Sequence, residues 1–170
     1  AIAFSHTHTG ADSGVMTISK AMPIQNEVVI SQKNEPIINS PKATLVQLYK
    51  IATGQKLLLI NIHAINFVKR EYLFSQLNKL GEIISKHQGP VIIAGDFNTW
   101  KRGMIKFLNQ FAERYNLKEA RFSKDIRKKF RGFPLDHFLS RGMSIEKAEV
   151  LKDGNSSDHL PLSIKVKIND

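Results

Sequence analysis

The sequence predicts an α+β fold in one domain, and three observations support this prediction. A chain of 170 residues falls within the usual size of one domain and can bury a sizeable core. Short runs rich in apolar and β-branched residues indicate strands, while two other segments carry apolar residues at helical spacing. No internal repeat, low-complexity tract or flexible linker divides the chain. We therefore expect residues 1–170 to form a single continuous domain.

Short apolar runs are the predicted strands, because β-branched and aromatic side chains suit the pleated surface of a sheet. They cover residues 14–19, 27–31, 43–51, 56–63, 91–94, 135–140 and 160–168. The segment ATGQ, residues 52–55, separates two of these runs with the composition of a hairpin connection. We expect the strands on either side of it to be antiparallel neighbours.

Two segments show helical periodicity instead. In the first, apolar residues recur at i, i+4, i+7 and i+11, namely at Leu73, Leu77, Leu80 and Ile84. In the second they recur at i, i+4 and i+7, namely at Met104, Leu108 and Phe111. A glycine before a proline in HQGP, residues 87–90, is a typical stop signal for the first helix. We expect each helix to cover a sheet face.

Composition excludes several classes of protein. Hydrophobic residues make up 42% and charged residues 24%, and no apolar run approaches the roughly 20 residues that a membrane span requires. We therefore expect no transmembrane segment. The sequence contains no cysteine, which excludes disulfides, thiolate nucleophiles and cysteine-ligated zinc. A cysteine-free chain is compatible with a reducing compartment, and we predict a cytoplasmic location.

The charge balance favours anionic partners. Lysine and arginine number 25 against 15 acidic residues, a net charge of +10 that suits nucleic acid or an acidic membrane surface. Residues 121–132 concentrate this charge around two phenylalanines, as in proteins that bind single strands. A solvated loop anchored by its two aromatic rings explains the same segment. The candidates for substrate binding are Arg127, Lys128, Lys129 and Arg131.

Polar clusters occur at the ends of four predicted strands. They comprise His63, then Asp96 with Asn98, then Asp136 with His137, and finally Asp158 with His159. Taken singly, Asp96 with Asn98 is explained by an Asx-type turn, Asp158 by a turn before Pro161, and His63 by a hydrogen-bonded core histidine. Taken together they indicate a site, because grouped carboxylates repel one another unless a cation offsets their charge.

These motifs, in their order along the chain, resemble the endonuclease/exonuclease/phosphatase superfamily, which includes DNase I. The similarity rests on SGVMTISKAMPI, LINIHA, VIIAGDFN, PLDHFL and SSDHLPL. NIHAINF followed by GPVIIAGDFNTW is more similar still to a bacterial group, the YafD-like proteins. The resemblance implies a four-layer α/β/β/α sandwich of the DNase I type. It also implies a metal-dependent hydrolase of phosphate esters.

The resemblance assigns a role to five residues. Asp96 matches the carboxylate that orients and deprotonates the attacking water, and Asn98 matches the amide that holds a phosphate oxygen. His159 matches the histidine that contacts the phosphate, and Asp136 matches the carboxylate that orients its ring. His63 matches a second histidine that acts as an acid or as a phosphate contact. We expect these side chains to meet in one active site.

The resemblance also implies a metal ion, with Asp158 as a ligand. Mg²⁺ is expected, with Mn²⁺ as an alternative, because hard oxygen ligands suit it. The family's Asn and Glu motifs normally precede GVMTIS, and this chain lacks both, so it corresponds to the C-terminal two thirds of the domain. We therefore expect weak metal binding and weak turnover, unless His6 and His8 form a substitute site. The alternative for this end is disorder.

Three functions follow, in order of preference. The first is a metal-dependent phosphodiesterase acting on nucleic acid. The second is a phosphatase or phospholipase C-like hydrolase acting on phosphoinositide or sphingomyelin-type head groups. The third is a non-catalytic module that binds nucleic acid. Without its first strands the fold would expose sheet edges, so we also expect self-association through those edges.

Overall fold

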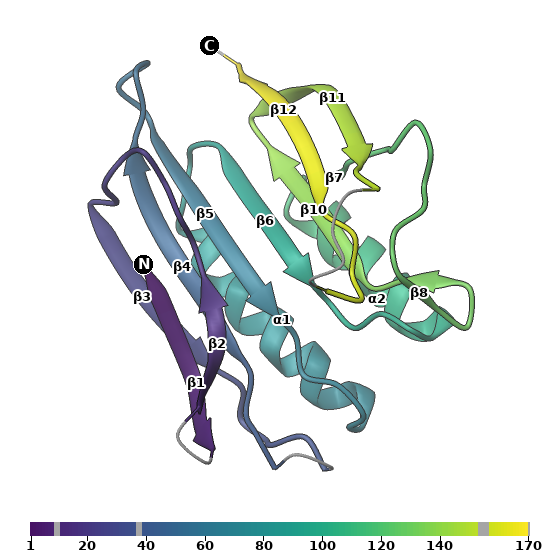
Figure 1. Ribbon diagram of the computed structural model, residues 1–170. Helices are drawn as coiled ribbons and strands as arrows, with labels where there is room; N and C mark the ends of the chain where they lie inside the picture. The colour runs from purple at the N-terminus through teal and green to yellow at the C-terminus, as the bar shows by residue number, and fades with distance from the viewer. Residues whose placement is uncertain (9–10, 37–38, 153–156, 170) are drawn as a thin grey trace.

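The chain folds around a six-stranded mixed sheet (Figure 1). The computed structural model describes every residue except 9–10, 37–38, 153–156 and 170. In spatial order the sheet contains β3 (Gln25–Ile30), β4 (Ala43–Lys50), β5 (Lys56–His63), β6 (Val91–Asp96), β10 (Asp136–Arg141) and β7 (Lys118–Glu119). Only the central pair of strands, β5 and β6, is parallel, and all other neighbours in this sheet are antiparallel. The pairing of β4 with β5 confirms the predicted hairpin.

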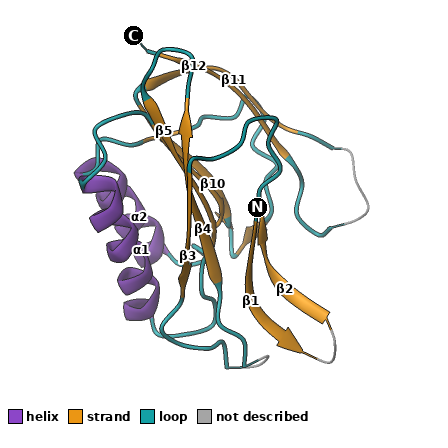
Figure 2. Cartoon of the chain, turned by 90° about the vertical axis from the view of Figure 1, so that its left-hand side faces the viewer, coloured by secondary structure: helices purple, strands orange, loops and turns teal. Residues whose placement is uncertain are grey.

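Two helices cover one face of this sheet (Figure 2). They are α1 (Arg70–Ser85) and α2 (Arg102–Arg114), and both coincide with the predicted helices. The four periodic residues of α1 are at most 1% exposed, and those of α2 are at most 4% exposed. They pack against buried residues of β5 and β6, including Ile60 and Ile93. The helical spacing in the sequence therefore identified the apolar stripe that forms the main core.

Three two-stranded sheets complete the described structure. They are β1 (Ile2–His8) with β2 (Ala11–Met16), β8 (Lys129–Phe130) with β9 (Phe133–Pro134), and β11 (Met143–Val150) with β12 (Leu162–Ile168). The β1–β2 hairpin contacts β4 and lies on the face opposite the helices (Figure 2). The mixed helix and strand content confirms the predicted α+β class, with β-structure on one side of the main sheet and helices on the other.

Two well-formed strands, β1 and β11, were missed by the sequence reading, and both contain an irregularity. The pairing register shifts between Phe4 and His6 in β1, and between Ile145 and Lys147 in β11. An extra residue at such a bulge breaks the two-residue alternation of apolar and polar side chains. The sequences of these strands, IAFSHTH and MSIEKAEV, are also too polar to form the apolar, β-branched runs that predicted the other strands. The segment around residues 6–8, read as a disordered end, is instead part of a strand.

Exposed apolar residues concentrate on the N-terminal part of the structure. They are Ile2, Phe4, Met16, Ile18, Met22, Ile24, Val28 and Ile30, each at least 38% exposed. The strand β3 is also an outer strand of the main sheet, with one side unpaired. Such an edge can pair with a second chain, so self-association stays a prediction. In the described part of the chain, neither helix has the length and apolar character that crossing a bilayer would require.

Candidate active site

Three of the predicted catalytic residues are aligned by the register of the main sheet. His63 is the last residue of β5 and lies directly beside Asp96, the last residue of β6. Asp96 in turn lies beside Asp136, the first residue of the antiparallel strand β10. The carboxyl ends of the parallel pair thus meet the beginning of β10 at one edge of the sheet. Buried strands fix the backbones, while the loops beyond them open the side chains to solvent.

The turn after β6 holds Asp96 and Asn98 in a fixed relation. The Asn98 backbone N–H donates to Asp96 Oδ1 over 2.8 Å, and Asn98 adopts a left-handed φ of 50°. Asparagine tolerates this conformation better than most residues. The Asn98 side-chain Nδ2 donates to the backbone carbonyl oxygen of Ala64 over 2.8 Å. The Asx-type turn considered from the sequence is therefore present, and it is also the feature that positions both side chains.

The loop before β12 returns His159 to the same edge. Its Nδ1 lies 2.7 Å from Asp136 Oδ2, which is hydrogen-bonding distance. The His159 backbone N–H donates to Ser157 Oγ over 3.1 Å, so the turn preceding the ring is also held. A carboxylate on one ring nitrogen selects the tautomer and leaves the other nitrogen for a ligand. The structure thus brings together the pair that the resemblance implied.

Burial shifts the pKa values at this edge in opposite directions. Burial lowers the pKa of His63 to about 4, with contributions from nearby Lys42 and His159. Burial raises the pKa of Asp96 to about 6, against the effect of the Asn98 hydrogen bond and with a further increase from Asp136. His63 Nε2 lies 3.7 Å from Asp96 Oδ2. At neutral pH this contact joins a neutral imidazole and a carboxylate, and is not a full salt bridge.

These residues line a cavity of about 270 Å³. His63, Asp96, Asn98, Asp158 and His159 all contribute to its wall. A larger cavity of about 940 Å³ lies elsewhere, beside β7 and β11, and none of the five predicted catalytic residues lines it. The chemistry available in the smaller cavity, and not its size, makes it the candidate active site.

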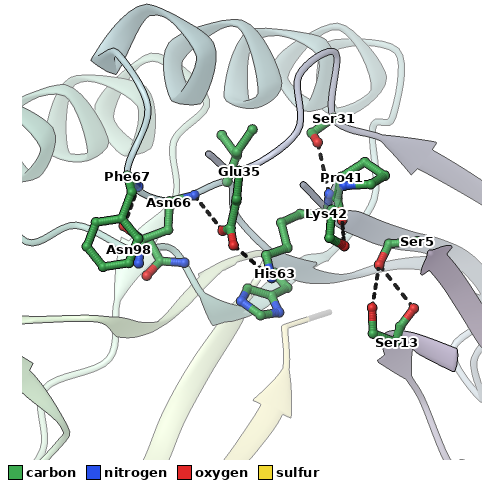
Figure 3. Close-up of polar contacts among 12 residues, drawn as sticks. Ser5, Ser13, Ser31, Glu35, Pro41, Lys42, His63, Asn66, Phe67 and Asn98 are labelled. Carbon is green, nitrogen blue, oxygen red and sulfur yellow. Dashed lines mark hydrogen bonds and ion pairs between the residues drawn. The ribbon is translucent and has the colours of Figure 1, made fainter. Parts of the chain in front are cut away.

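Two further residues of the cavity, Glu35 and Lys42, were not identified as site residues from the sequence. Figure 3 shows the Glu35 carboxylate between Asn66 and the Lys42 side chain, close to His63. Glu35 accepts a hydrogen bond from the Asn66 backbone N–H over 2.9 Å and lies 3.3 Å from Lys42 Nζ. Both side chains are largely buried, at 8% and 12% exposed. No sequence motif marks them, because they come from the loop between β3 and β4.

The described residues do not make a complete metal site. Across the described ranges, no three histidine, aspartate or glutamate side chains are placed to hold one ion. Asp158, the predicted ligand, is 77% exposed and pairs with Lys128 Nζ at 3.1 Å. The hydrogen bond and charge of Lys128 hold the pKa of Asp158 below its usual range. The Glu35 carboxylate is likewise engaged, by Lys42 Nζ and by the backbone N–H of Asn66. The side chains of His6 and His8 lie outside the described residues.

The four cations predicted to bind substrate occupy different environments. Lys129 and Arg131 are exposed and Lys128 lines the cavity. Arg127 is only 9% exposed. Its guanidinium donates to the carboxylates of Asp125 and Glu119 and to the backbone carbonyl oxygen of Asp136. Arg127 is therefore a buried residue that stabilises the start of β10. This corrects the prediction that Arg127 binds substrate. The contact of the other three with substrate stays a prediction.

A second histidine–carboxylate pair lies behind the cavity. His137 follows Asp136 on β10 and points to the other face of the sheet, where it is 1% exposed. Its Nδ1 lies 2.7 Å from Glu119 Oε1, and its Nε2 lies 2.6 Å from Thr99 Oγ1. Arg127 shares the same Glu119 oxygen over 2.9 Å. The ring is therefore a hydrogen-bonded core histidine.

Comparison with known protein families places this site in context. The profile of the Endonuclease/Exonuclease/phosphatase family matches residues 3–159. The chain is 38% identical over 163 residues to the UPF0294 protein VP2298 of Vibrio parahaemolyticus, covering 95% of this chain. It is 42% identical over 154 residues to a UPF0294 protein of Klebsiella pneumoniae, covering 90% of this chain. The chain spans 57% of the length of both curated relatives.

Solved structures share the fold. An endonuclease/exonuclease/phosphatase family protein from Leptotrichia buccalis superimposes with a TM-score of 0.70 at 16% identity, covering 99% of this chain and 71% of that chain. A beta toxin variant from Staphylococcus aureus, with bound magnesium ions, gives a TM-score of 0.64 at 13% identity. That match covers 89% of this chain and 66% of the toxin. At these identities the likeness shows the fold alone, which confirms the predicted DNase I-like class.

Proposed function

Because this chain belongs to the Endonuclease/Exonuclease/phosphatase family, we propose that its cavity hydrolyses phosphate esters. The motifs of the sequence had predicted this family and the similarity to the YafD-like group. One observation carries the proposal. His63, Asp96 and Asp136 stand side by side on three neighbouring strands, and His159, which lines the same cavity as His63 and Asp96, hydrogen-bonds to Asp136. This arrangement offers a base, an oriented imidazole and polar contacts for a phosphoryl group.

Asp96 is the proposed base. Its pKa of about 6 leaves it ionised at neutral pH, yet close enough to neutrality to accept a proton efficiently. A water molecule held by Asp96 would attack the phosphorus, forming a new P–O bond while the bond to the leaving oxygen breaks. The proton of the water passes to the carboxylate. The Asn98 backbone N–H, bonded to Oδ1, leaves Oδ2 as the oxygen for this transfer.

The two histidines of the cavity would contact the phosphoryl group. Asp136 orients His159 through Nδ1, so that Nε2 is available to a phosphate oxygen or to the leaving oxygen. His63, whose pKa is lowered to about 4, is neutral at neutral pH and therefore suited to donate a hydrogen bond and not to act as a strong acid. Of the two roles considered for His63, the structure favours the phosphate contact. Asn98 would place its amide beside the same oxygens.

Nucleic acid is the proposed substrate class. The net charge of +10 and the cations beside the cavity favour a polyanionic ligand whose binding weakens with salt. Phosphoinositide or sphingomyelin-type head groups are the alternative with the same chemistry. Hydrolysis or binding that depends on a lipid surface would favour that alternative. A cytoplasmic location also stays a proposal, which rests on the cysteine-free sequence.

Dependence on Mg²⁺, with Mn²⁺ as a substitute, is proposed from the family and from Asp158. The bound magnesium in the beta toxin structure is consistent with this proposal for a protein of the same fold. Asp158 and Glu35 are both paired with lysines, so we expect weak Mg²⁺ binding by this chain. Isothermal calorimetry of Mg²⁺ binding, with Asp158→Asn as control, tests this expectation. Tight binding that survives Asp158→Asn would show that other residues hold the ion.

The proposed hydrolase activity is tested by removing Asp96, the proposed proton acceptor. Asp96→Asn should reduce hydrolysis of bis-p-nitrophenyl phosphate by roughly 10²–10⁴-fold, because the amide cannot accept the proton of the water. Circular dichroism should show an unchanged fold, since asparagine can still accept the Asn98 N–H. Equal activity of parent and variant would exclude Asp96 as the base.

A non-catalytic module that binds nucleic acid is the third candidate, and one observation favours it. No cluster of three metal-binding side chains exists among the described residues. Under this alternative, the chain would bind an oligonucleotide and release no product with or without Mg²⁺ or Mn²⁺. Detectable hydrolysis that disappears in Asp96→Asn would exclude it.

A further inference from the structure

Three aromatic side chains from separate segments form one wall of the candidate active site. Phe67 follows β5, Trp100 follows β6, and Phe130 belongs to β8. All three line the cavity that contains His63, Asp96 and His159. The Phe67 and Trp100 ring centroids are 6.2 Å apart, and those of Trp100 and Phe130 are 6.0 Å apart. We call these three residues the aromatic wall.

The aromatic wall is held in place by the backbone and by one asparagine. Trp100 Nε1 donates to Asn66 Oδ1 over 2.7 Å, and the Phe67 backbone N–H donates to the same oxygen over 2.8 Å. Phe67 itself has a φ of 54°, a conformation that bulky residues rarely adopt. Such conformations concentrate at functional sites because the surrounding structure must enforce them. The Trp100 ring and the backbone that carries Phe67 are therefore preorganised beside the cavity.

Two of the three rings remain open to solvent although they stand at a cavity. Phe67 is 53% exposed and Phe130 is 44% exposed, whereas Trp100 between them is 9% exposed. The sequence hypothesis that Phe130 anchors a solvated loop in the core therefore does not describe this residue. Exposed aromatic faces at a cavity mark a surface that is completed by a ligand.

Cations surround the aromatic wall. Lys101 Nζ lies 4.2 Å from the Trp100 ring centroid. The Arg131 guanidinium lies 5.8 Å from the Trp100 centroid and 5.7 Å from the Phe130 centroid. Arg131 also has a left-handed φ of 52°, which directs the chain around Phe130. Aromatic faces interleaved with cations are the combination that binds bases by stacking and phosphates by charge.

We propose that Phe67, Trp100 and Phe130 form a stacking site for the nucleobase next to the scissile phosphate, so that the site takes single-stranded nucleic acid. This inference rests on the proposed phosphoesterase function, which it extends by naming the substrate class and the residues that recognise it. A base stacked on the exposed faces would place its own phosphate between the aromatic wall and the pair of His159 and Asp136. A duplex keeps its bases stacked on one another, so it presents no free face.

The geometry favours a base over a lipid surface. The three rings come from the ends of β5 and β6 and from β8, and they converge on the cavity that also contains His63 and Asp96. Membrane-binding aromatic residues have to project outward together to reach the acyl chains. Trp100 is too buried to insert into a bilayer, and its Nε1 is already bonded to Asn66. A planar base that enters the cavity can stack on the exposed ring of Phe67 or of Phe130, and Trp100 fixes the angle between them, since its ring is tilted by 39° to Phe67 and stands at 89° to Phe130.

Binding of two matched oligonucleotides tests the proposal without requiring turnover. One is a fluorescein-labelled oligothymidylate, and the other has the same length and phosphates but abasic residues throughout. The parent chain should bind the oligothymidylate more tightly. Phe67→Ala and Phe130→Ala should each weaken that binding by roughly 5- to 150-fold, and they should leave binding of the abasic strand unchanged.

Two control variants separate stacking from general damage. Phe130→Tyr keeps an aromatic face and should retain binding. Phe4→Ala removes a phenylalanine of similar exposure, 55%, on β1, and should change neither affinity. Circular dichroism of each variant checks the fold, which should persist because the replaced rings are largely exposed.

Two results would overturn the inference. Equal affinity of the parent chain for the thymidine and abasic strands, unaffected by Phe67→Ala, would show that bases are not stacked. Loss of binding to phosphatidylinositol bisphosphate vesicles in Phe67→Ala and Phe130→Ala, with oligothymidylate binding intact, would assign the aromatic wall to lipid. Failure of the proposed function looks different, because base-dependent binding would persist while neither parent nor Asp96→Asn hydrolysed any diester.

Discussion

Two histidine–carboxylate pairs lie back to back at the beginning of β10. Asp136 holds His159 in the cavity, and its neighbour along the strand, His137, is held by Glu119 behind the sheet. Both contacts measure 2.7 Å between nitrogen and oxygen. They differ in access, since the His159 side chain is 27% exposed and that of His137 is 1% exposed. The same histidine–carboxylate geometry thus occurs at an accessible cavity, with His159, and in the buried interior, with His137.

The electrostatic environments of the two pairs differ as well. Burial raises the pKa of Asp136, although His159 works against the shift. Glu119 is also partly buried, but His137 and Arg127 outweigh burial and lower its pKa. The environment thus favours the neutral form of Asp136 and the ionised form of Glu119, each relative to the free side chain. A short histidine–carboxylate distance therefore does not identify a catalytic pair unless a cavity adjoins it.

Breaking the accessible pair should have the largest effect. Asp136→Asn should lower hydrolysis by roughly 10²–10⁴-fold, because the amide favours the wrong tautomer of His159. The urea midpoint should stay close to that of the parent, since the side chain lines a cavity. Steady-state rates with a diester substrate and urea unfolding measure the two quantities. Near-normal turnover would remove Asp136 from the site.

Breaking the buried pair should affect stability instead. Glu119→Gln leaves His137 without its anion and leaves Arg127 with Asp125 alone. The change should cost about 1–3 kcal/mol of stability, a value moderated because water reaches the partly exposed Glu119. Turnover of the folded protein should remain within about threefold of the parent, because Glu119 does not line the cavity. Urea unfolding beside the same rate assay measures this. A loss of turnover as large as that of Asp136→Asn would contradict the distinction between the pairs.

Hydrolysis and folding stability should also depend on pH in different ranges, because they depend on different carboxylates. Asp96 gains its charge as pH rises through about 6, so hydrolysis should rise by about tenfold per pH unit below that value and level off above it. The pKa of Glu119 is lowered from 4.5, so its stabilising contribution is present above pH 4.5 and is lost below it. Hydrolysis rates measured across pH check the prediction for Asp96, and urea midpoints measured across pH check the prediction for Glu119. Activity and stability falling together near pH 6 would contradict separate sites.

The smallest effect should come from substitutions in the basic segment, residues 121–132, and should appear in the salt dependence of binding. Lys129→Ser and Arg131→Ser should each lower the slope of log affinity against log salt for an oligonucleotide by up to about 1. Arg127→Ser should instead lower stability, because its guanidinium serves Asp125 and Glu119 inside the fold. Salt titration of binding distinguishes the variants. An unchanged slope for Lys129→Ser and Arg131→Ser would make them solvated surface residues.

Sequence reasoning identified the core better than the strands. The helical stripes at Leu73 and Met104 are buried as expected, because a period near 3.6 is a direct image of one helix face. The strands β1 and β11 were not predicted because their sequences, IAFSHTH and MSIEKAEV, are too polar to form an apolar, β-branched run. Arg127 was assigned to substrate for its charge alone. Charge in a sequence does not reveal whether carboxylates lie close enough to bury a guanidinium.

The sequence by itself determined the family, the α+β class, the two helices and the residue types at the strand ends. These follow from local patterns and short motifs, which depend on neighbouring residues. Only the tertiary structure decided that Glu35, Lys42 and the aromatic wall meet the motif residues in one cavity. It also decided that His137 is buried behind the sheet while Asp136 bonds to His159, which lines the cavity. Such facts depend on pairing register and on segments far apart in the chain, for which a single sequence carries no local signal.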